Sequence, residues 1–319
     1  MAISVHHDLQ SPSEDLDIVP IPDDEIPTFF RERGDRLFAA HAASTYPLPV
    51  DGTEQERQDE LHSLLRALTE TSCANYIQEA LRQGAELRVV DLGTGTGSWV
   101  LDMARLFPSV SFYGVDIAPI ATRFPPPNVT FEVHDLQVTS RYTRGSFDIV
   151  HARLVCIAMP AYHQVVEEAA RILRSGGLFS ACEWSRSIAM ADGTDVTRKA
   201  PRACAFLEVL WDILGRPTDI SASPSQVVAD AILQCPDFDR VVTTVAHYPV
   251  GQWHPDIFCR LTGARVSDVL GSYALALKPF LQSLLPGAIV RELVDGFIAD
   301  ISTVGGLVTA YTAFHAQRI

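Results

Sequence analysis

The chain has 319 residues and a mass of 35.0 kDa, a size that suits one large α/β domain with additions or two modest domains. Hydrophobic residues make up 47% of the chain and charged residues 20%, which supports a full core and excludes global disorder. The 39 acidic residues outnumber the 25 basic residues, and the net charge of −14 disfavours nucleic acid and anionic membranes as partners.

Targeting and cysteine patterns narrow the class further. The apolar runs are far shorter than the roughly 20 residues that span a bilayer, and the first residues show no signal-peptide pattern. We therefore expect a soluble cytoplasmic protein, with a nuclear location as the alternative. The six cysteines include no CxxC pair, so neither a disulfide framework nor a metal site is expected.

The N-terminal part divides into an arm and a helical segment. Residues 1–30 carry seven acidic residues, four prolines and no lysine or arginine, which predicts a mobile acidic arm. Residues 31–84 are predicted to form an N-terminal helical lid. Within this segment a helical pattern begins at residues 31–40, prolines interrupt it, and residues 53–81 carry apolar residues at helical spacing.

Short apolar runs alternate with helical patterns through residues 85–193, and further strands follow within residues 235–319. The strand-like segments are 87–91, 111–116, 129–133, 147–150, 177–183, 240–248 and 309–315, and helical stretches include 99–107 and 162–174. Strands separated by helices of about 10–15 residues form βαβ units. We therefore predict an α/β fold with a doubly wound, mainly parallel sheet.

Two longer helical insertions interrupt this alternation, at residues 194–234 and 252–300. A crossover between parallel strands needs only about a dozen residues, so both insertions cannot be simple crossovers. We expect them to form a lid over the carboxyl ends of the strands, where open sheets bind ligands, or a homodimer surface. The lid offers aromatic residues that could contact an acceptor or simply fill its core: Phe206, Trp211, Trp253 with His254, Phe258, Tyr273 and Phe280.

The most specific motif is a glycine loop between the first strand and the first helix of the core. It reads Val90-Asp91-Leu92-Gly93-Thr94-Gly95-Thr96-Gly97-Ser98. Glycine at alternate positions permits tight turns and close approach of a ligand, and the following helix offers free N–H groups. Residue 98 is serine where the dinucleotide motif GxGxxG requires its third glycine. The spacing therefore favours an S-adenosylmethionine (SAM) site, with Gly93, Thr94, Gly95 and Gly97 as contacts.

Acidic residues stand at the ends of three successive strands. Asp116 is placed to accept hydrogen bonds from both ribose hydroxyls, Asp135 to accept one from an adenine amino group, and Asp91 to hold the methionyl ammonium directly or through water. Each acid alone could be a helix cap or a surface charge. Together they indicate a ligand site, because unpaired buried charges are costly. Ile117 and Leu136 directly follow two of these acids and are further expected contacts.

Several segments besides the glycine loop share a recognisable pattern. They are Tyr46–Asp51 with Glu54, Gly114–Asp116 with Pro119, Pro126–Val129 before Asp135, Phe147–Arg153, and Arg171–Gly177 with Glu183. With the loop they resemble the class I SAM-dependent methyltransferases, and more narrowly the LaeA-like (UMTA-type) fungal methyltransferases of secondary metabolism. The resemblance spans residues 31–185 well and the rest loosely.

The resemblance carries structural and chemical expectations. It implies a Rossmann-like seven-stranded sheet whose last strand, at about residues 309–317, is antiparallel. It also implies SAM as the cofactor, S-adenosyl-L-homocysteine (SAH) as its product, and Tyr46 packed against the cofactor, although plain packing of that ring is an equal alternative.

Methyl transfer from a sulfonium is an in-line displacement, so the protein must align the reactants, exclude water and, for a hydroxyl acceptor, supply a general base. The candidate catalytic residues are His151, which is also a candidate cofactor contact, and Glu183. Each has a structural alternative, a histidine bonded to the backbone or a glutamate that caps a helix or pairs with Arg186. Arg153 could bind a carboxylate or phosphate of the acceptor, or form a salt bridge.

The leading hypothesis is methyl transfer from SAM to an oxygen or nitrogen of a small, largely apolar metabolite. One alternative is a SAM-binding regulator of secondary metabolism that acts through protein partners, with the acidic arm as a docking segment. Another is an enzyme that binds SAM without methylating. Nucleic-acid methylation is disfavoured, because His151-Ala152-Arg153 stands where amino-methylating enzymes carry an Asn/Asp-Pro-Pro-aromatic motif.

Overall fold

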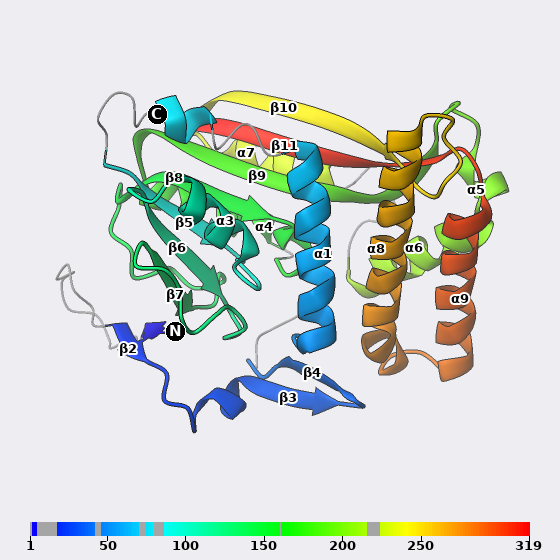
Figure 1. The fold of residues 1–319 in the computed structure, drawn as a ribbon, viewed down its shortest axis with the longest axis horizontal. Helices are drawn as coiled ribbons and strands as arrows, with labels where there is room; N and C mark the ends of the chain where they lie inside the picture. Colours follow the sequence, from blue (N-terminus) through cyan, green and yellow to red (C-terminus); the bar gives the residue numbers. More distant parts are fainter. Residues whose placement is uncertain are drawn as a thin grey trace.

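The computed structural model describes residues 2–4, 18–41, 46–69, 75–79, 86–159, 161–215 and 224–319. Its centre is one mixed sheet with the strand order β10-β11-β9-β8-β5-β6-β7-β1-β2 (Figure 1). The strands are β1 (Ala2–Ser4), β2 (Ile18–Pro20), β5 (Arg88–Leu92), β6 (Ser111–Asp116), β7 (Val129–Val133), β8 (Phe147–Arg153), β9 (Leu173–Met190), β10 (Phe238–Pro249) and β11 (Leu307–Arg318).

The pairing of these strands confirms the predicted doubly wound sheet. β5 pairs in parallel with β6 and β8, β6 with β7, and β8 with β9, whereas β11 is antiparallel to both β9 and β10. The last strand is thus antiparallel, as expected. Beyond the seven expected strands, β1 and β2 extend the β7 edge. Residues 2–4 and 18–20 of the predicted mobile arm therefore belong to the sheet, and residues 5–17 lie outside the described residues.

The parallel strands are buried on both faces, as their nearly continuous apolar sequences require. On one face Val89 and Ile149 pack against Trp99 in α3 (Ser98–Leu106). The opposite face packs against α4 (Tyr162–Ile172) and α7 (Pro224–Gln234). Helices on both faces leave the carboxyl ends of β5 to β9 as the accessible edge of the sheet.

A hairpin replaces the helix that we expected at residues 31–40. The 3₁₀ turn Ile26–Phe29 leads into β3 (Phe30–Arg33), which pairs with β4 (Arg36–Ala39). Gly34 lies in the turn between them with a positive φ of 66°. The guanidinium of Arg36 and the backbone N–H of Leu37 bind the carboxylate of Asp51, at 2.6 Å and 3.2 Å. The expectation was wrong because these non-local bonds outweigh local helix propensity.

A second core holds the lid together. Its helices are α5 (Val196–Lys199), α6 (Pro201–Ile213), α8 (Ile257–Gln282) and α9 (Gly287–Thr303). Phe206 and Phe297 meet in this core with ring centroids 4.6 Å apart. The buried carboxylate of Asp300 on α9 accepts the backbone N–H groups of Arg202 and Ala203 at 2.9 and 3.0 Å, which fixes the start of α6.

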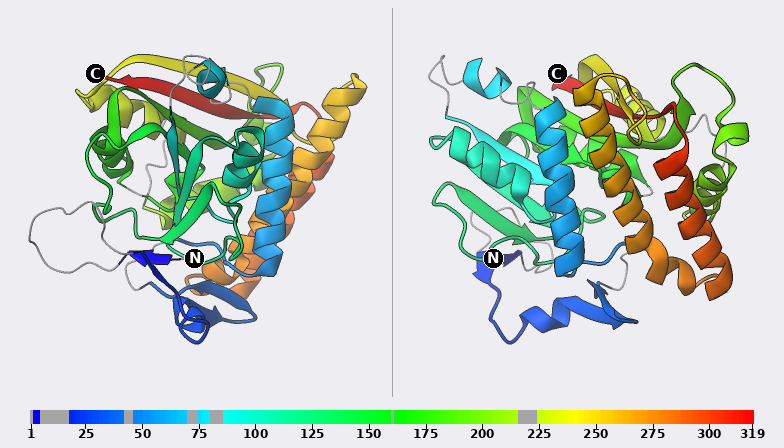
Figure 2. Two further views of the ribbon diagram at one scale, coloured as in Figure 1. Left: turned by 60° about the vertical axis from the view of Figure 1, so that its left-hand side comes forward. Right: turned by 45° about the vertical axis from the view of Figure 1, so that its right-hand side comes forward.

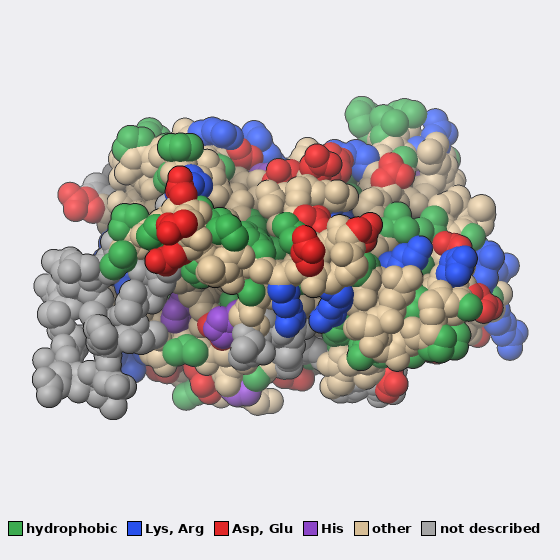
Figure 3. All heavy atoms as spheres, turned by 90° about the horizontal axis from the view of Figure 1, so that it is seen from below, with side chains coloured by type: hydrophobic (Ala, Val, Ile, Leu, Met, Phe, Trp, Pro, Cys, Tyr) green, Lys and Arg blue, Asp and Glu red, His purple; other side chains and the backbone are tan. Residues whose placement is uncertain are grey.

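The long helix α1 (Gly52–Thr69) stands between the sheet and the lid, where it contacts α3 and α8 (Figure 2). Among the described residues, none of the helices is both long and apolar enough to cross a membrane. On the face drawn in Figure 3, acidic and basic side chains are interspersed and do not gather into one broad basic area.

Candidate active site

A cavity of about 230 Å³ lies at the carboxyl ends of β5 to β9, between the sheet, α1 and the lid. Its floor carries the glycine loop and the strand-end acids. Its roof carries side chains of α1, and its far wall carries apolar side chains of β9, α6, α8 and α9. The cavity therefore joins the predicted cofactor site to the predicted lid in one space.

The glycine loop forms the floor because its backbone occupies conformations that favour glycine. Gly93, Gly95 and Gly97 have φ values of 74°, 57° and 79°. A Cβ on Gly97 would collide with the ring of Phe131, and one on Gly95 would lie 2.5 Å from Oε1 of Gln58 on α1. The loop is anchored by N–H groups of residues 93 and 94, which donate to the carbonyl of Val115 at 2.8 and 2.9 Å. Gly93, Thr94 and Gly95 line the cavity, whereas Gly97, also a predicted contact, does not.

The three predicted acids all reach this cavity. Asp116 accepts N–H groups of Gly95 at 2.8 Å and Ala118 at 3.1 Å. Burial raises the pKa of its carboxyl, and these N–H groups partly oppose the shift. Asp135 lies 3.6 Å from His41. The structure therefore brings Asp91, Asp116 and Asp135 together as the sequence predicts.

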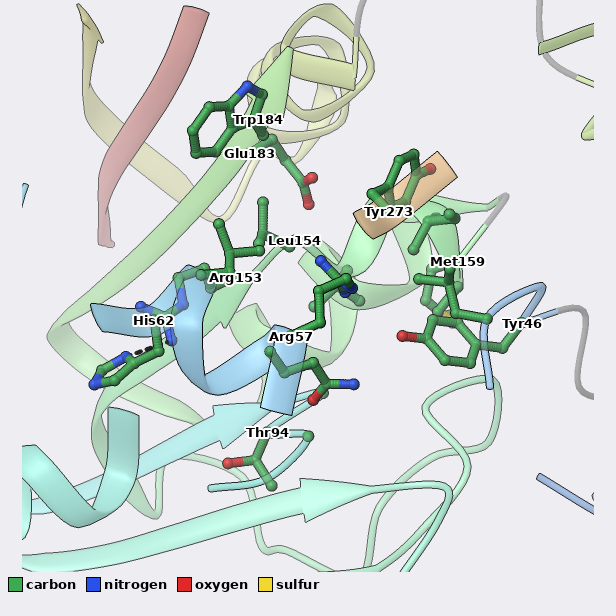
Figure 4. A pocket seen from close by; sticks show the side chains of 18 of the residues that line it. Tyr46, Arg57, His62, Thr94, Arg153, Leu154, Met159, Glu183, Trp184 and Tyr273 are labelled. Carbon is green, nitrogen blue, oxygen red and sulfur yellow. Dashed lines mark hydrogen bonds between the residues drawn. The ribbon is translucent and has the colours of Figure 1, made fainter. Parts of the chain in front are cut away.

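The remaining predicted cofactor contacts also line the cavity: Tyr46, Ile117 and Leu136. Tyr46 precedes α1 and lies on the opposite side of the cavity from His62 (Figure 4). Burial, and then the nearby carboxylate of Glu54, raise the pKa of the Tyr46 phenol, so it stays protonated at neutral pH.

His151 is a correction to the predicted site. Its side chain is buried, does not line the cavity, and binds the carboxylate of Asp91 at 2.8 Å through Nδ1. Its ring stacks on Trp99 with centroids 3.8 Å apart. Strand alternation explains this, because residues 151 and 91 face each other on the side of the sheet that α3 covers. His151 is thus not placed to touch an acceptor or a cofactor.

Glu183, the second predicted catalytic residue, does line the cavity. It is buried, comes from β9 and points into the cavity beside Leu154 (Figure 4). Its Oε1 accepts the N–H of Cys156 at 2.9 Å, which fixes the carboxylate. Leu154 holds a φ of 61°, a left-handed conformation that is strained for a non-glycine residue and that recurs at functional sites.

Helix α1 contributes lining residues that the sequence analysis missed: Arg57, Gln58, Leu61 and His62. The guanidinium of Arg57 makes a bidentate pair with buried Glu54, at 2.6 and 2.9 Å. Burial lowers the pKa of Arg57, but the Glu54 carboxylate raises it by more. The sequence signal for this pair is the spacing of three residues between Glu54 and Arg57, which places both side chains on one face of the helix.

The part of the cavity away from the glycine loop is mainly apolar, with Trp184, Ile188, Leu207, Val269 and Phe297 in its wall. Its polar part is a hydroxyl cluster in which Ser185 and Ser187 lie 2.6 Å apart and Thr309 accepts the indole N–H of Trp184 at 2.8 Å.

Only some of the predicted acceptor contacts line the cavity. Arg153 and Tyr273 line the cavity, but Trp211, Trp253 and His254 do not. The indole of Trp253 donates instead to the carbonyl of Leu307 at 2.9 Å, and His254 accepts the N–H of Asp256 just before α8. These two residues precede α8, whereas the cavity wall comes from its middle.

SAM fits this set of residues. Its amino group and sulfonium carry positive charge, and the cavity offers the carboxylates of Asp91, Asp116 and Asp135. The floor also has room for a ligand only because residue 93 is glycine, since a Cβ there would lie 2.9 Å from the side chain of Val155. A pyrophosphate would meet the same carboxylates unfavourably. The sheet, the glycine loop and the strand-end acids define a class I SAM-dependent methyltransferase domain.

Comparisons with known proteins agree. Residues 83–217 match the family described as a methyltransferase domain. The secondary metabolism regulator laeA of Coprinopsis cinerea is 36% identical over 157 residues, which cover 48% of this chain and 39% of that protein. The methyltransferase pytC of Aspergillus terreus is 28% identical over 257 residues, which cover 79% of this chain and 76% of that protein. These matches show that residues 83–217 form a methyltransferase domain, with SAM as its cofactor, and that the chain is similar to laeA regulators and to pytC.

Two further matches are more distant. The protein-methionine methyltransferase laeA of Emericella nidulans is 26% identical over 71% of this chain and 59% of its own length. The structure of Haemonchus contortus phosphoethanolamine N-methyltransferase 2 covers 92% of this chain and 72% of that chain at 12% identity and a TM-score of 0.45. The chain spans about two fifths of the length of several laeA regulators that it matches.

Proposed function

We propose that the protein transfers the methyl group of SAM to an oxygen or nitrogen of a small, mainly apolar metabolite. The observation that carries this proposal is the continuity of the cavity. One continuous space holds the glycine loop and the strand-end acids at one end and, at the other, an apolar wall with a hydroxyl cluster. Such a wall suits a compact apolar molecule with few polar groups.

The residues of the chain divide the work of the reaction. SAM, when bound, supplies an activated methyl group with a good leaving group. The glycine loop, Asp116 and Asp135 hold its nucleoside part, and α1 covers the site and excludes water. The carboxylate of Glu183, fixed by the N–H of Cys156, is the base that takes the proton of an acceptor hydroxyl as the carbon–oxygen bond forms.

The test uses SAM with a labelled methyl group and two fractions of the source cells, the small molecules and the proteins. We expect label in a small molecule, with a mass gain of one methylene unit. Leu207→Trp, which fills the acceptor side of the cavity, should abolish this transfer and leave SAH binding intact. Transfer only to protein would overturn the proposal in favour of the activity named for the Emericella nidulans relative. Transfer to neither fraction would favour a regulator or a non-methylating enzyme.

A further inference from the structure

Four polar residues form a row across the central sheet. In the strand register Asp91 on β5 faces His151 on β8, which faces Ser180 on β9, which faces His315 on β11. Directly opposed residues put their side chains on the same face of a sheet. Asp91, His151 and Ser180 are only 3%, 3% and 1% exposed. A buried polar row of this kind is costly unless its members are bonded, so its presence calls for a reason.

Within the row, Asp91 and His151 are bonded to each other. Nδ1 of His151 lies 2.8 Å from Oδ1 of Asp91. Because an ionised carboxylate can only accept, Nδ1 carries the proton and donates it. Trp99 fixes the plane of the imidazole ring, since the two rings are 7° from parallel at 3.8 Å. The carboxylate of Asp91 is therefore held in one orientation by His151, from the side of the sheet that α3 covers.

The two members of this pair differ in what they can reach. Asp91 lines the cavity and His151 does not. A ligand can thus meet the carboxylate but not the imidazole that orients it. SAM carries an ammonium group at its amino-acid end, and a fixed carboxylate at the start of the glycine loop is a suitable acceptor for it.

We infer that His151 is a positioning residue that, clamped by Trp99, presents the Asp91 carboxylate to the amino-acid ammonium of the cofactor. His315, at the end of the row, supports this role. Burial, and then His151, lower the pKa of His315, so it is neutral at neutral pH and adds no positive charge that would compete for Asp91. The inference rests on the identity of the cofactor and not on methyl transfer.

The test compares two ligands that differ in the amino-acid end. SAH has the ammonium, and 5′-methylthioadenosine has the same nucleoside without it. Their affinities are measured by calorimetry for the full chain and for His151→Leu, with His163→Leu on the exposed side of α4 as the matched control. We expect His151→Leu to weaken SAH about ten- to hundredfold, as for loss of a hydrogen bond to a charged group, and to change 5′-methylthioadenosine less than about twofold.

A rescue variant separates positioning from general support of the fold. His151→Asn keeps an N–H near the place of Nδ1 and should recover most of the SAH affinity, whereas His151→Gln, whose amide reaches further, should not. The comparison of His151→Asn with His151→Gln also tests the inference if His151→Leu does not fold. Equal weakening of both ligands by His151→Leu, or none, would overturn the inference.

Two further outcomes separate this inference from the proposed function. A wild-type chain that binds neither ligand would overturn the cofactor assignment and the inference with it. Selective loss of SAH affinity without any detectable turnover would uphold the inference while the proposed function fails.

Discussion

The imidazole of His62 on α1 lies 3.0 Å from the guanidinium of Arg153 at the end of β8. A guanidinium can only donate, so Nδ1 of His62 accepts and its Nε2–H donates to Asp102 on α3, at 2.9 Å. This chain of hydrogen bonds connects α1, which lies over the cavity, to strand β8 and to helix α3. A second tie is Asp59, which accepts the hydroxyls of Thr96 and Ser98 in and after the glycine loop at 2.7 and 2.6 Å.

His62→Ala should therefore loosen α1 over the cofactor. Removal of two part-buried hydrogen bonds with charged partners is expected to cost about 1.5–3 kcal/mol of unfolding free energy and to weaken SAH about tenfold. Arg66→Ala is the control, because Arg66 binds the same Asp102 from an exposed position and should cost less than about 1 kcal/mol. Urea unfolding and calorimetry measure the two effects. Equal losses in the two variants would contradict the role of His62.

The glycine loop should tolerate no side chain at Gly97. Gly97→Ala combines a left-handed backbone with a collision against Phe131, and we expect it to cost about 2–5 kcal/mol and to lower SAH affinity. Gly193→Ala is a matched control, because Gly193 has a similar φ of 74° but no atom of the described residues within 4 Å of the place that its Cβ would take. It should cost only the backbone term, about 1–2 kcal/mol, with SAH affinity unchanged. Chemical denaturation of both variants separates the backbone strain from the collision with Phe131. Equal losses of unfolding free energy in the two variants would rule out the collision.

Acid should weaken the fold partly through Glu168 on α4. Burial alone would raise the pKa of this carboxyl, but hydrogen bonds from Arg171 and Ser140 outweigh burial and lower it below its ordinary value of 4.5. A carboxyl whose pKa is lower in the folded state stabilises the fold above its unfolded pKa, and this contribution disappears as the pH falls through the folded pKa.

Glu168→Gln should thus cost about 1.5–3 kcal/mol at neutral pH. The difference from wild type should shrink as the pH falls below about 4.5, the ordinary value. Unfolding free energies across a pH series give the measurement, with the exposed neighbour substituted in Glu167→Gln as the control. A difference that stays constant with pH would contradict this assignment.

The sequence predicted which residues of the glycine loop and the strand ends meet at one cavity, because this part of the candidate site is local. A strand, a glycine loop, a helix and the acids at neighbouring strand ends are fixed by spacing alone, and Asp91, Asp116 and Asp135 meet as the parallel sheet requires. The roof and the acceptor wall depend on how α1 and the lid pack on that sheet, which involves contacts far apart in the chain. His62, for example, meets a residue 91 positions later.

His151 shows the same limit within a single strand. Its position at the end of a strand predicted a residue that contacts the cofactor, whereas the structure places it behind Asp91, which it binds and which lines the cavity in its place. Which face of the sheet it occupies depends on register, and a shift of one residue would have turned it away from α3. The predicted acceptor contacts that do not line the cavity are Trp211, Trp253 and His254. The reason is related, because aromatic content identifies a helical lid but not which of its residues line the cavity.

Glu183→Gln gives the sharpest test of the proposed base. The substituted amide keeps the shape of the side chain and an oxygen that can accept the N–H of Cys156, so the fold and SAH affinity should hold. It cannot take a proton, and turnover of a hydroxyl acceptor should fall about 10²–10⁴-fold at unchanged KM for SAM. Glu208→Gln on the exposed side of α6 is the control and should leave turnover unchanged. A variant with full turnover would show that the acceptor loses its proton to solvent, and a loss of SAH affinity equal to the loss of turnover would place Glu183 in the cofactor site instead.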